Sequence, residues 1–191
     1  MRFAELADRV RASPARLGGT RLVVVDGPAG SGKTTFADRL AAELDDAPVV
    51  HLDDLYAGWT LDGVVDRLRD QVLGPLAAGR EARFLAYDWA AGEFAVPTTV
   101  PVAGVLVVEG CGAAARAVDD VVSLRVWVQA PPEVCAERWA ARGGAAMTAF
   151  QPDWARAEAV VFAREDTRAR ADVRVDGAPV TPPPPGSFAL A

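Results

Sequence analysis

The chain has few of the residues that build metal sites and disulfide frameworks. Its 191 residues contain two cysteines, Cys111 and Cys135, and a single histidine, His51. No closely spaced set of cysteines and histidines is present that could hold zinc. A domain of this length buries most of its apolar surface without cross-links, so we interpret both cysteines as buried thiols.

Hydrophobic runs long enough to cross a bilayer are also missing. Runs such as residues 22–25 and 105–108 are far too short to span it and instead predict buried strands. Residues 1–11 mix arginine with acidic residues and lack the apolar stretch and cleavage site of a secretory signal. We therefore expect a cytoplasmic protein with no membrane partner.

Positive charge is scarce as well. The net charge is −6 and the isoelectric point is near 4.8. Because nucleic-acid binding rests on a basic surface, no nucleic-acid partner is expected, whereas a small charged ligand is compatible with this balance. Lys33 is the only lysine of the chain, and it lies in a glycine-rich loop.

Expected strands and helices alternate along the chain. Short apolar runs predict strands at residues 22–25, 49–52, 82–89, 105–108, 124–128 and 173–175. Apolar residues at helical spacing predict helices at residues 3–11, 34–44, 61–76, 131–142 and 154–170. Two stretches are expected to lack regular structure: an irregular segment at 92–101, and a loose proline-rich tail at 177–191.

This alternation predicts an α/β fold in which helices sandwich a parallel sheet. No repeat or linker divides the sequence, so residues 1–191 are expected to form a single domain, with an N-terminal helix within residues 1–18. His51, inside the second expected strand, is interpreted as structural. Ligands of such sheets bind beyond the carboxyl ends of the strands, so the informative polar residues should follow strands directly.

One segment that follows a strand carries a specific motif. Residues 27–34 satisfy G-x-x-x-x-G-K-[ST] between an expected strand and an expected helix. Glycines let successive N–H groups point at phosphate oxygens, and the helix adds its positive N-terminal end. The motif predicts a P-loop NTPase fold that binds ATP or GTP through Gly27, Pro28, Ala29, Gly30, Ser31, Gly32, Lys33, Thr34 and Thr35.

The motif also predicts a magnesium site. Lys33 is expected to reach the β- and γ-phosphates, and the Thr34 hydroxyl to bind Mg²⁺. Glu109 ends the apolar run 105–108, where a strand beside the P-loop strand would aim its carboxylate at the same metal. The alternative is a solvent-facing glutamate at a strand end.

Adjacent carboxylates, Asp53 and Asp54, follow the second expected strand. One of them is expected to face the γ-phosphate from the acceptor side. A hydroxyl acceptor profits from a carboxylate that accepts its proton, whereas an ionised phosphate acceptor would want arginine, and residues 51–61 contain none. This predicts a hydroxyl acceptor, the alternative being that the carboxylate caps a turn or helix.

Characteristic motifs occur in order at residues 27–34, 53–56, 87–89 and 108–110. In order and spacing they resemble the uridine kinase (uridine-cytidine kinase) family. The resemblance implies that Asp53 is the catalytic base and that Glu109 is the acidic residue at the strand end. It also implies that Tyr56, Tyr87 and Trp89 bind the substrate, with aromatic faces available for stacking.

The same family places arginines on a lid helix after its fourth strand. Arg138 and Arg142 lie one turn apart in the helix expected at 131–142, so both can face one ligand. They would neutralise charge on the transferring phosphoryl group. The alternative is an exposed basic face near the helix end.

These features predict an ATP- and magnesium-dependent kinase that transfers the γ-phosphoryl group to a hydroxyl of a small, nucleoside-like acceptor. Two alternatives stay open. The loop also resembles that of cytidylate kinases, which suggests a nucleoside monophosphate kinase, and a P-loop ATPase or nucleotide switch would need no acceptor. No pattern in the sequence indicates an oligomeric state.

Overall fold

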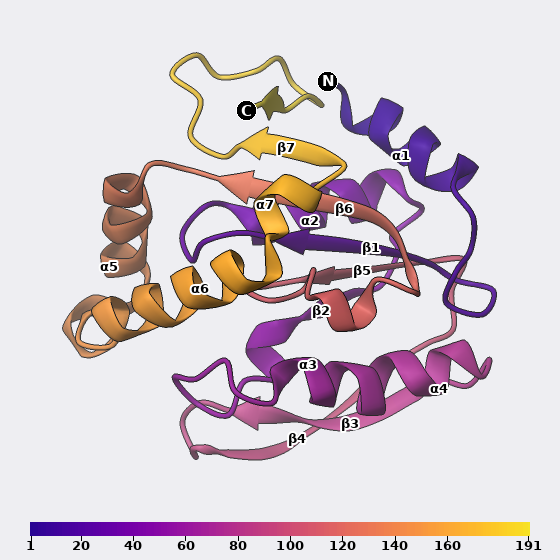
Figure 1. Cartoon of the computed structure of the whole chain (residues 1–191), viewed down its shortest axis with the longest axis horizontal. Coiled ribbons are helices and arrows are strands. Elements are labelled where there is room, and N and C mark those ends of the chain that lie inside the picture. The colour runs from indigo at the N-terminus through magenta and orange to yellow at the C-terminus, as the bar shows by residue number, and fades with distance from the viewer.

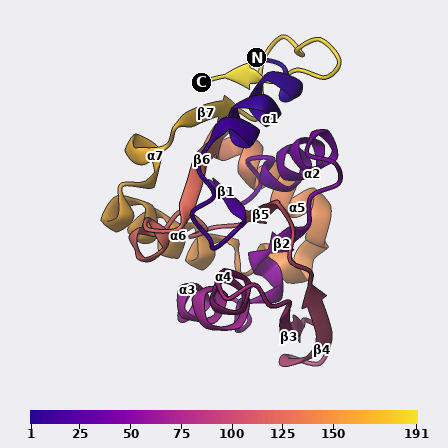
Figure 2. The same cartoon turned by 90° about the vertical axis from the view of Figure 1, so that its right-hand side faces the viewer.

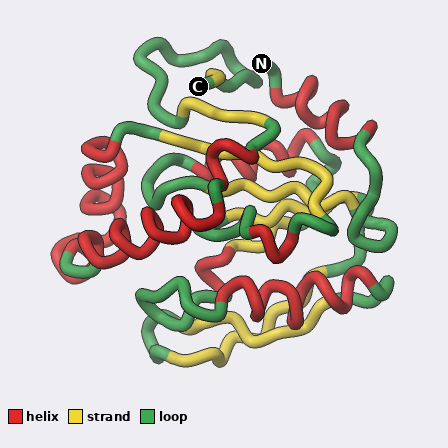
Figure 3. The backbone as a smooth tube through the Cα atoms, in the orientation of Figure 1, coloured by secondary structure: helices red, strands yellow, loops and turns green.

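A six-stranded sheet with the P-loop strand near its centre organises the molecule (Figures 1 and 3). The structure, a computed structural model, describes residues 1–191, with side chains at 1–142 and 147–191. The first five strands in spatial order are parallel, and the last is antiparallel to its neighbour. That order is β2 (Val49–His51), β5 (Val105–Glu109), β1 (Arg21–Asp26), β6 (Val122–Gln129), β7 (Val173–Asp176) and β8 (Ala189–Leu190).

The central strand β1 is buried on both faces. Val23 and Val25 pack into one hydrophobic cluster, whereas Leu22 and Val24 pack into the other, as the period of two along a strand requires. All of these side chains are fully buried. The predicted parallel sheet, covered by helices on both faces, is confirmed, and the carboxyl ends of β1, β2 and β5 meet at one edge.

Helices form a layer on each side of the sheet (Figure 2). On one face, α1 (Phe3–Ala12) and α2 (Lys33–Glu43) cover β1. On the other lie the continuous helical segments 64–77 and the helices that follow β6. The helical elements other than α1 and α2 are η1 (Leu52–Asp54), α3 (Val64–Arg67), η2 (Leu68–Leu73), α4 (Gly74–Ala77), η3 (Arg116–Val118), α5 (Pro132–Thr148), α6 (Gln151–Glu165) and α7 (Thr167–Arg170). No helix of the described residues is both long and apolar enough to cross a membrane.

Some expected helix bounds shift. The helix expected at 61–76 begins at Val64 and contains a π-helical stretch, Leu68–Leu73. The helix expected at 154–170 begins at Gln151 and breaks at Asp166, whose φ of 52° is incompatible with a continuing α-helix. The helix expected to end at residue 142 extends to Thr148.

A separate hairpin extends beyond the main sheet, beside the helical segments 64–77 (Figure 1). It pairs β3 (Ala82–Asp88) with β4 (Glu93–Val100) in antiparallel register. The expectation of an irregular segment at 92–101 is therefore wrong. Pro97 is accommodated because each strand of a two-stranded ribbon has a free edge, where a missing N–H breaks no ladder bond.

The expectation of a loose tail at 177–191 is wrong for the end of that segment, which is docked. Phe188 is buried, with its ring centroid 5.0 Å from that of Phe3 and 5.1 Å from that of Phe36. Its backbone N–H donates to the Met1 carbonyl, which brings both termini together (Figure 1). The proline run forms a loop at the surface, and Phe188, which follows it, packs into the core.

Candidate active site

The glycine-rich loop wraps between β1 and the start of α2 in a conformation that depends on its glycines. Gly30 and Gly32 have φ values of 82° and 101°, in the region that favours glycine. A Cβ at Gly30 would lie 2.5 Å from the Cys135 carbonyl oxygen, so a side chain has no room there. The helix begins at Lys33 without a side-chain cap, which leaves its first N–H groups available to an anion.

Lys33 lies buried at the centre of this loop. Its Nζ donates to the Pro28 carbonyl oxygen at 2.9 Å and lies 3.7 Å from the Cys111 sulfur. Burial lowers the pKa of the ammonium group, but surrounding acidic groups raise it further, so the net pKa is above the ordinary value. Lys33 is therefore a fixed positive charge at the phosphate-binding loop.

Asp26, the last residue of β1, was not assigned to the site from the sequence, yet its side chain holds the P-loop in position. This fully buried carboxylate accepts backbone N–H bonds from Gly27 at 2.7 Å, Gly112 at 3.0 Å and Ala114 at 2.9 Å. Burial raises its pKa to about 6 although those bonds act in the opposite direction. Asp26 thus ties the P-loop to the segment that follows β5, a pairing that only the folded chain reveals.

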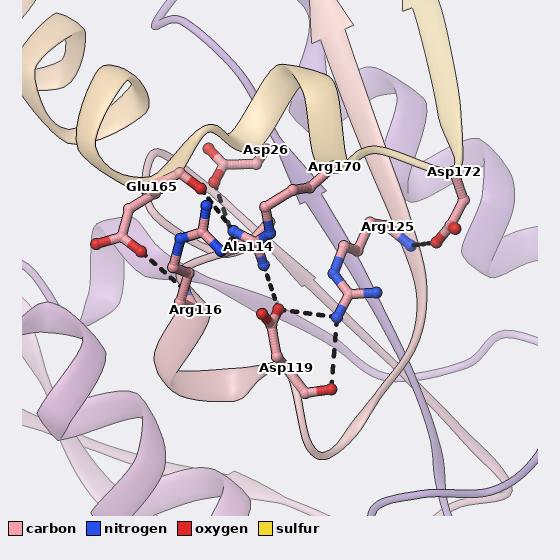
Figure 4. Close-up of polar contacts among 8 residues, drawn as sticks. All are labelled: Asp26, Ala114, Arg116, Asp119, Arg125, Glu165, Arg170 and Asp172. Atoms are coloured by element: carbon pink, nitrogen blue, oxygen red, sulfur yellow. Dashed lines mark hydrogen bonds and ion pairs between the residues drawn. The ribbon is translucent and has the colours of Figure 1, made fainter.

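The segment that follows β5 is also held from its outer side (Figure 4). Asp119 binds two guanidinium groups, Arg125 at 2.8 Å and the closely approaching Arg170. The backbone N–H of Arg116 donates to Glu165 at 2.9 Å. These contacts anchor residues 110–119 to β6 and to the helices that follow α5, so both loops that meet at Asp26 have fixed positions.

Thr34 and Glu109, the expected magnesium ligands, lie together. The Thr34 hydroxyl donates to Glu109 Oε1 at 3.0 Å, and His51 Nδ1 lies 2.8 Å from the same oxygen. Burial raises the pKa of Glu109, but His51, Lys33 and Thr34 outweigh it, so the pKa is lowered. A hydroxyl and a carboxylate are hard oxygen donors of the kind that Mg²⁺ takes alongside phosphates and water. Within the described residues there is no cluster of three or more His, Cys, Asp or Glu side chains that could hold a metal ion.

His51 is a site residue that the sequence analysis assigned only a structural role. It ends β2 beside Glu109, because the register pairs the two residues across neighbouring strands. The Glu109 hydrogen bond raises the pKa of His51 against the opposing effect of burial. Its position at the end of a short strand gave no signal of this contact, which depends on β2 lying next to β5.

Asp53 faces a cavity of about 570 Å³ that also contains the P-loop and Glu109. Asp54 does not line that cavity, so the structure distinguishes the two neighbours. The Asp53 side chain is open to the cavity, yet the surrounding protein limits its solvation. This burial and the nearby Glu109 raise its pKa, while Lys33 and Arg142 partly oppose the rise.

The residues expected at the substrate side occupy different positions. Tyr56 is buried in the cavity wall, and its hydroxyl donates to the Cys111 carbonyl at 3.1 Å. Trp89 lines the cavity, and its indole N–H donates to the Asp53 carbonyl at 3.2 Å. Tyr87 is not among the cavity-lining residues and instead packs edge-on against Trp89, with ring centroids 5.2 Å apart.

Three further tryptophans, Trp59, Trp139 and Trp154, line the cavity and were missed. Trp59 comes from the loop before α3, and the other two come from α5 and α6. In sequence each looks like an ordinary core residue. The only available signal was compositional, since tryptophans occur near several of the candidate motifs.

Both expected arginines line the cavity, but they are held differently. Arg138 donates to the Gly30 carbonyl at 3.1 Å and to the Gly177 carbonyl at 3.0 Å, which ties α5 to the P-loop. Arg142 has its guanidinium 5.9 Å from the ring centroid of Trp139. Arg142 is therefore placed beside an aromatic ring of the cavity wall, whereas Arg138 is tied to the P-loop backbone.

Glu158 on α6 is a second buried carboxylate that the sequence did not reveal. Its Oε2 accepts the Ala29 backbone N–H at 3.0 Å and the Trp154 indole N–H at 3.1 Å. The Cys111 thiol also donates to it at 3.3 Å. Burial raises the pKa of Glu158 despite these bonds. It joins α6 to the P-loop.

A second cavity, of about 400 Å³, shares Gly32, Thr35 and Arg138 with the first. It lies on the side of the P-loop away from Asp53, and the docked C-terminal segment forms part of its wall. The P-loop therefore separates two spaces, one containing Asp53 and the tryptophans and the other walled by the segment after β7.

A parallel sheet whose central strand leads through a glycine-rich loop into a helix defines a protein with the P-loop nucleotide-binding fold. The chain belongs to the AAA domain family, whose model matches residues 23–159. Among solved structures, it is similar to a possible uridine kinase from Bacillus stearothermophilus, with 21% identity, coverage of 90% of this chain and 96% of that chain, and a TM-score of 0.67.

It is also similar to a protein assigned as a fructose transport system kinase from Silicibacter sp. TM1040, with 21% identity, coverage of 84% and 95%, and a TM-score of 0.58. No curated protein matches the chain. At these identities the structural likeness shows the fold, which confirms the predicted P-loop fold. It does not identify an activity or an acceptor.

Proposed function

We propose that this protein is an ATP-dependent kinase that transfers the γ-phosphoryl group to a hydroxyl of a small, nucleoside-like acceptor. The observation that carries the proposal is a single cavity lined by Lys33 and Thr34 of the P-loop, by Glu109 and by Asp53. A phosphate-binding end and an ionisable base in one cavity are what in-line phosphoryl transfer to an alcohol requires.

The nucleotide is expected to lie along the P-loop between the two cavities. Backbone N–H groups at the start of α2 and the Lys33 ammonium bind the β- and γ-phosphates. The nucleoside part extends into the cavity walled by Gly177 and the C-terminal segment. Thr34 and Glu109 would hold Mg²⁺, which, when bound, spreads the charge of the phosphates.

Asp53 is the expected general base. Its carboxylate faces the acceptor space, and its raised pKa makes it a better proton acceptor than an ordinary aspartate. Arg142 lies near enough to influence that pKa and can also contact the transferring phosphoryl group. Arg138, already bound to the P-loop backbone, positions the lid helix.

The test is an ADP-release assay with purified protein and Mg-ATP against nucleosides, sugars, pantothenate-like alcohols and nucleoside monophosphates. We expect at least one alcohol to raise the rate of ADP release and to yield a phosphorylated product detected by mass spectrometry. Stimulation by monophosphates alone would replace the proposal with a nucleoside monophosphate kinase. ATP hydrolysis that no acceptor changes would replace it with an ATPase.

A further inference from the structure

The acceptor side of the main cavity is walled by aromatic rings around Trp59. The Trp59 ring centroid lies 4.7 Å from Trp89, 5.0 Å from Phe150 and 5.5 Å from Trp139. Trp154 packs edge-on at 6.2 Å. The chain contains only five tryptophans, and four of them line this cavity. The loop before α3, the end of β3 and helices α5 and α6 converge to bring them together (Figure 1).

The polar groups of these rings are largely used within the protein. The indole N–H groups of Trp89, Trp139 and Trp154 donate to the Asp53 carbonyl, the Met147 carbonyl and Glu158, at 3.2, 2.9 and 3.1 Å. Tyr56, also in the wall, donates its hydroxyl to a backbone carbonyl. Among the described side chains, Trp59 has the only indole N–H in the cavity without a protein acceptor.

The remaining charged groups lie at the phosphate end or point to the reacting hydroxyl. Lys33, Thr34 and Glu109 surround the expected phosphates and metal, and Asp53 faces the acceptor hydroxyl. Arg138 is bound to the P-loop backbone, and Arg142, close enough to Asp53 to lower its pKa, is assigned to the transferring phosphoryl group. The body of the acceptor therefore meets aromatic rings and the Met147 side chain, with one indole N–H within reach. Polar groups on that body would lose water without gaining partners, whereas an apolar ring would lose nothing.

We infer, resting on the proposed kinase function but replacing its nucleoside-like acceptor with a less polar one, that the acceptor is an alcohol whose body is a flat, mostly apolar ring packed against Trp59 and Trp89. Its hydroxyl reaches Asp53. The hydroxyl proton passes to the Asp53 carboxylate as the hydroxyl oxygen forms a bond to the γ-phosphorus. The bond from that phosphorus to the β–γ bridging oxygen breaks, and its electron pair leaves with ADP. Asp53 then returns the proton to water.

The first test compares acceptors of different polarity in the ADP-release assay. The probes are 3-phenylpropan-1-ol and 2-(2-naphthyl)ethanol as flat apolar alcohols, and uridine and glucose as polar ones. We expect kcat/KM for the better aryl alcohol to exceed that for uridine and for glucose by about tenfold or more, because unpaired polar groups of the latter two are desolvated. A higher kcat/KM for uridine or glucose overturns the inference and leaves the kinase function standing.

The second test changes the central ring. Trp59→Leu is expected to raise the KM for the aryl alcohol about tenfold, while the KM for ATP stays within about twofold. Trp59→Phe keeps a ring and removes only the N–H, so it should retain the aryl alcohol KM within about threefold. Leu85→Ala, at an exposed position of β3 outside the cavity, is the control for the hairpin and should change neither constant. Equal loss in Trp59→Phe and Trp59→Leu would mean that the N–H binds a polar acceptor, which contradicts the inference.

A binding measurement separates this inference from the function on which it rests. Titration with the aryl alcohol is expected to quench tryptophan fluorescence saturably in the wild type and far more weakly in Trp59→Leu, whose thermal unfolding is measured in parallel. If no alcohol stimulates ADP release but this Trp59-dependent binding is found, the kinase function fails and the apolar ligand site stands. If the aryl alcohol neither binds nor reacts, the inference is overturned.

Discussion

The phosphate end of the cavity and its acceptor end differ in how far apart in the sequence their residues lie. The phosphate end is built mainly from the consecutive residues 27–35 and from residues at the ends of neighbouring parallel strands. The acceptor end gathers rings from positions 59, 89, 139 and 154, which belong to four different elements or loops. One end is thus specified by backbone conformation, and the other by side-chain packing.

This difference separates reaction type from substrate choice. Backbone N–H groups, a lysine and a metal-binding pair recognise phosphates whatever the acceptor is. In the proposed kinase, the aromatic wall recognises the acceptor and plays no part in holding the nucleotide. Variants at the phosphate end should therefore reduce turnover with every acceptor, and variants at the aromatic wall should change affinity for the acceptor alone.

Lys33→Ala should have the largest effect and tests the phosphate end. The variant removes the buried positive charge beside the P-loop, and we expect turnover to fall about 10³- to 10⁵-fold, the range for a cation that stabilises a transferring phosphoryl group. This corresponds to roughly 4 to 7 kcal/mol of barrier. Initial rates are measured on protein shown to be folded by circular dichroism, with the exposed Arg9→Ala as control. Wild-type turnover in folded Lys33→Ala would remove Lys33 from the phosphate site.

Asp53→Asn tests the residue at which the two ends meet. It keeps the size and hydrogen-bonding capacity of the side chain but cannot take up the acceptor proton, so we expect a loss of about 10²- to 10⁴-fold in kcat. That loss corresponds to roughly 2.7 to 5.5 kcal/mol. The KM for ATP should change little.

Asp54→Asn is the matched control for Asp53, because Asp54 is adjacent and acidic but lies outside the cavity. We expect it to stay close to wild type. A variant Asp53→Asn with more than about a tenth of wild-type turnover would exclude Asp53 as the base, and a severe loss at Asp54 alone would transfer that role to its neighbour.

Asp26→Asn tests whether buried charge supports the phosphate end. Because the folded pKa is about 6 and the ordinary value is 3.8, native Asp26 holds its proton more tightly than the unfolded chain does. Its contribution to stability is therefore fully present below pH 3.8 and is lost as the pH rises through 6. At 1.36 kcal/mol per pH unit, the free energy of unfolding of the wild type should fall relative to that of the variant by up to about 3 kcal/mol between pH 4 and pH 7.

Urea denaturation at several pH values measures this difference. The exposed Asp8→Asn serves as the reference substitution. Parallel pH profiles for wild type and Asp26→Asn would show that the Asp26 pKa is the same in the folded and unfolded states, contrary to the expectation.

The two ends also differ in how well the sequence predicted them. The strand run 22–25 and the motif 27–34 are local patterns whose conformation follows from β-branched burial and from glycine, so both were assigned correctly from the sequence. The contacts of His51, Asp26 and Glu158 depend on which strands and helices become neighbours, and no local pattern encodes this.

Contacts that local patterns do not encode also explain the errors in the predicted fold. Segment 92–101 looked irregular because of its proline and threonines, yet it pairs with β3 as the free-edged partner of a ribbon. The tail looked loose because of its proline run, yet the Phe188 ring packs against Phe3, which lies near the N-terminus. The partner is the preceding strand in the first case and the distant N-terminal helix in the second, and in both cases pairing outweighed local propensity.

Trp89→Ala, compared with Tyr87→Ala, should have the smallest effect and tests how sharply the acceptor end is defined. Trp89 contributes a ring to the cavity, so its loss should raise the KM for the acceptor by about two- to twelvefold, as expected for one aromatic contact of 0.5–1.5 kcal/mol. Tyr87 lies behind Trp89 and touches it only edge-on, so its replacement acts by loosening that ring and should have a smaller effect. Neither variant should change the KM for ATP, because both rings lie away from the P-loop.

Steady-state kinetics measure the two constants, with the acceptor varied at saturating ATP and then ATP varied at a fixed acceptor concentration. Equal losses for ATP and acceptor would assign the two rings to the core of the hairpin, and a larger effect of Tyr87→Ala than of Trp89→Ala would place the acceptor on the other side of the Trp89 ring.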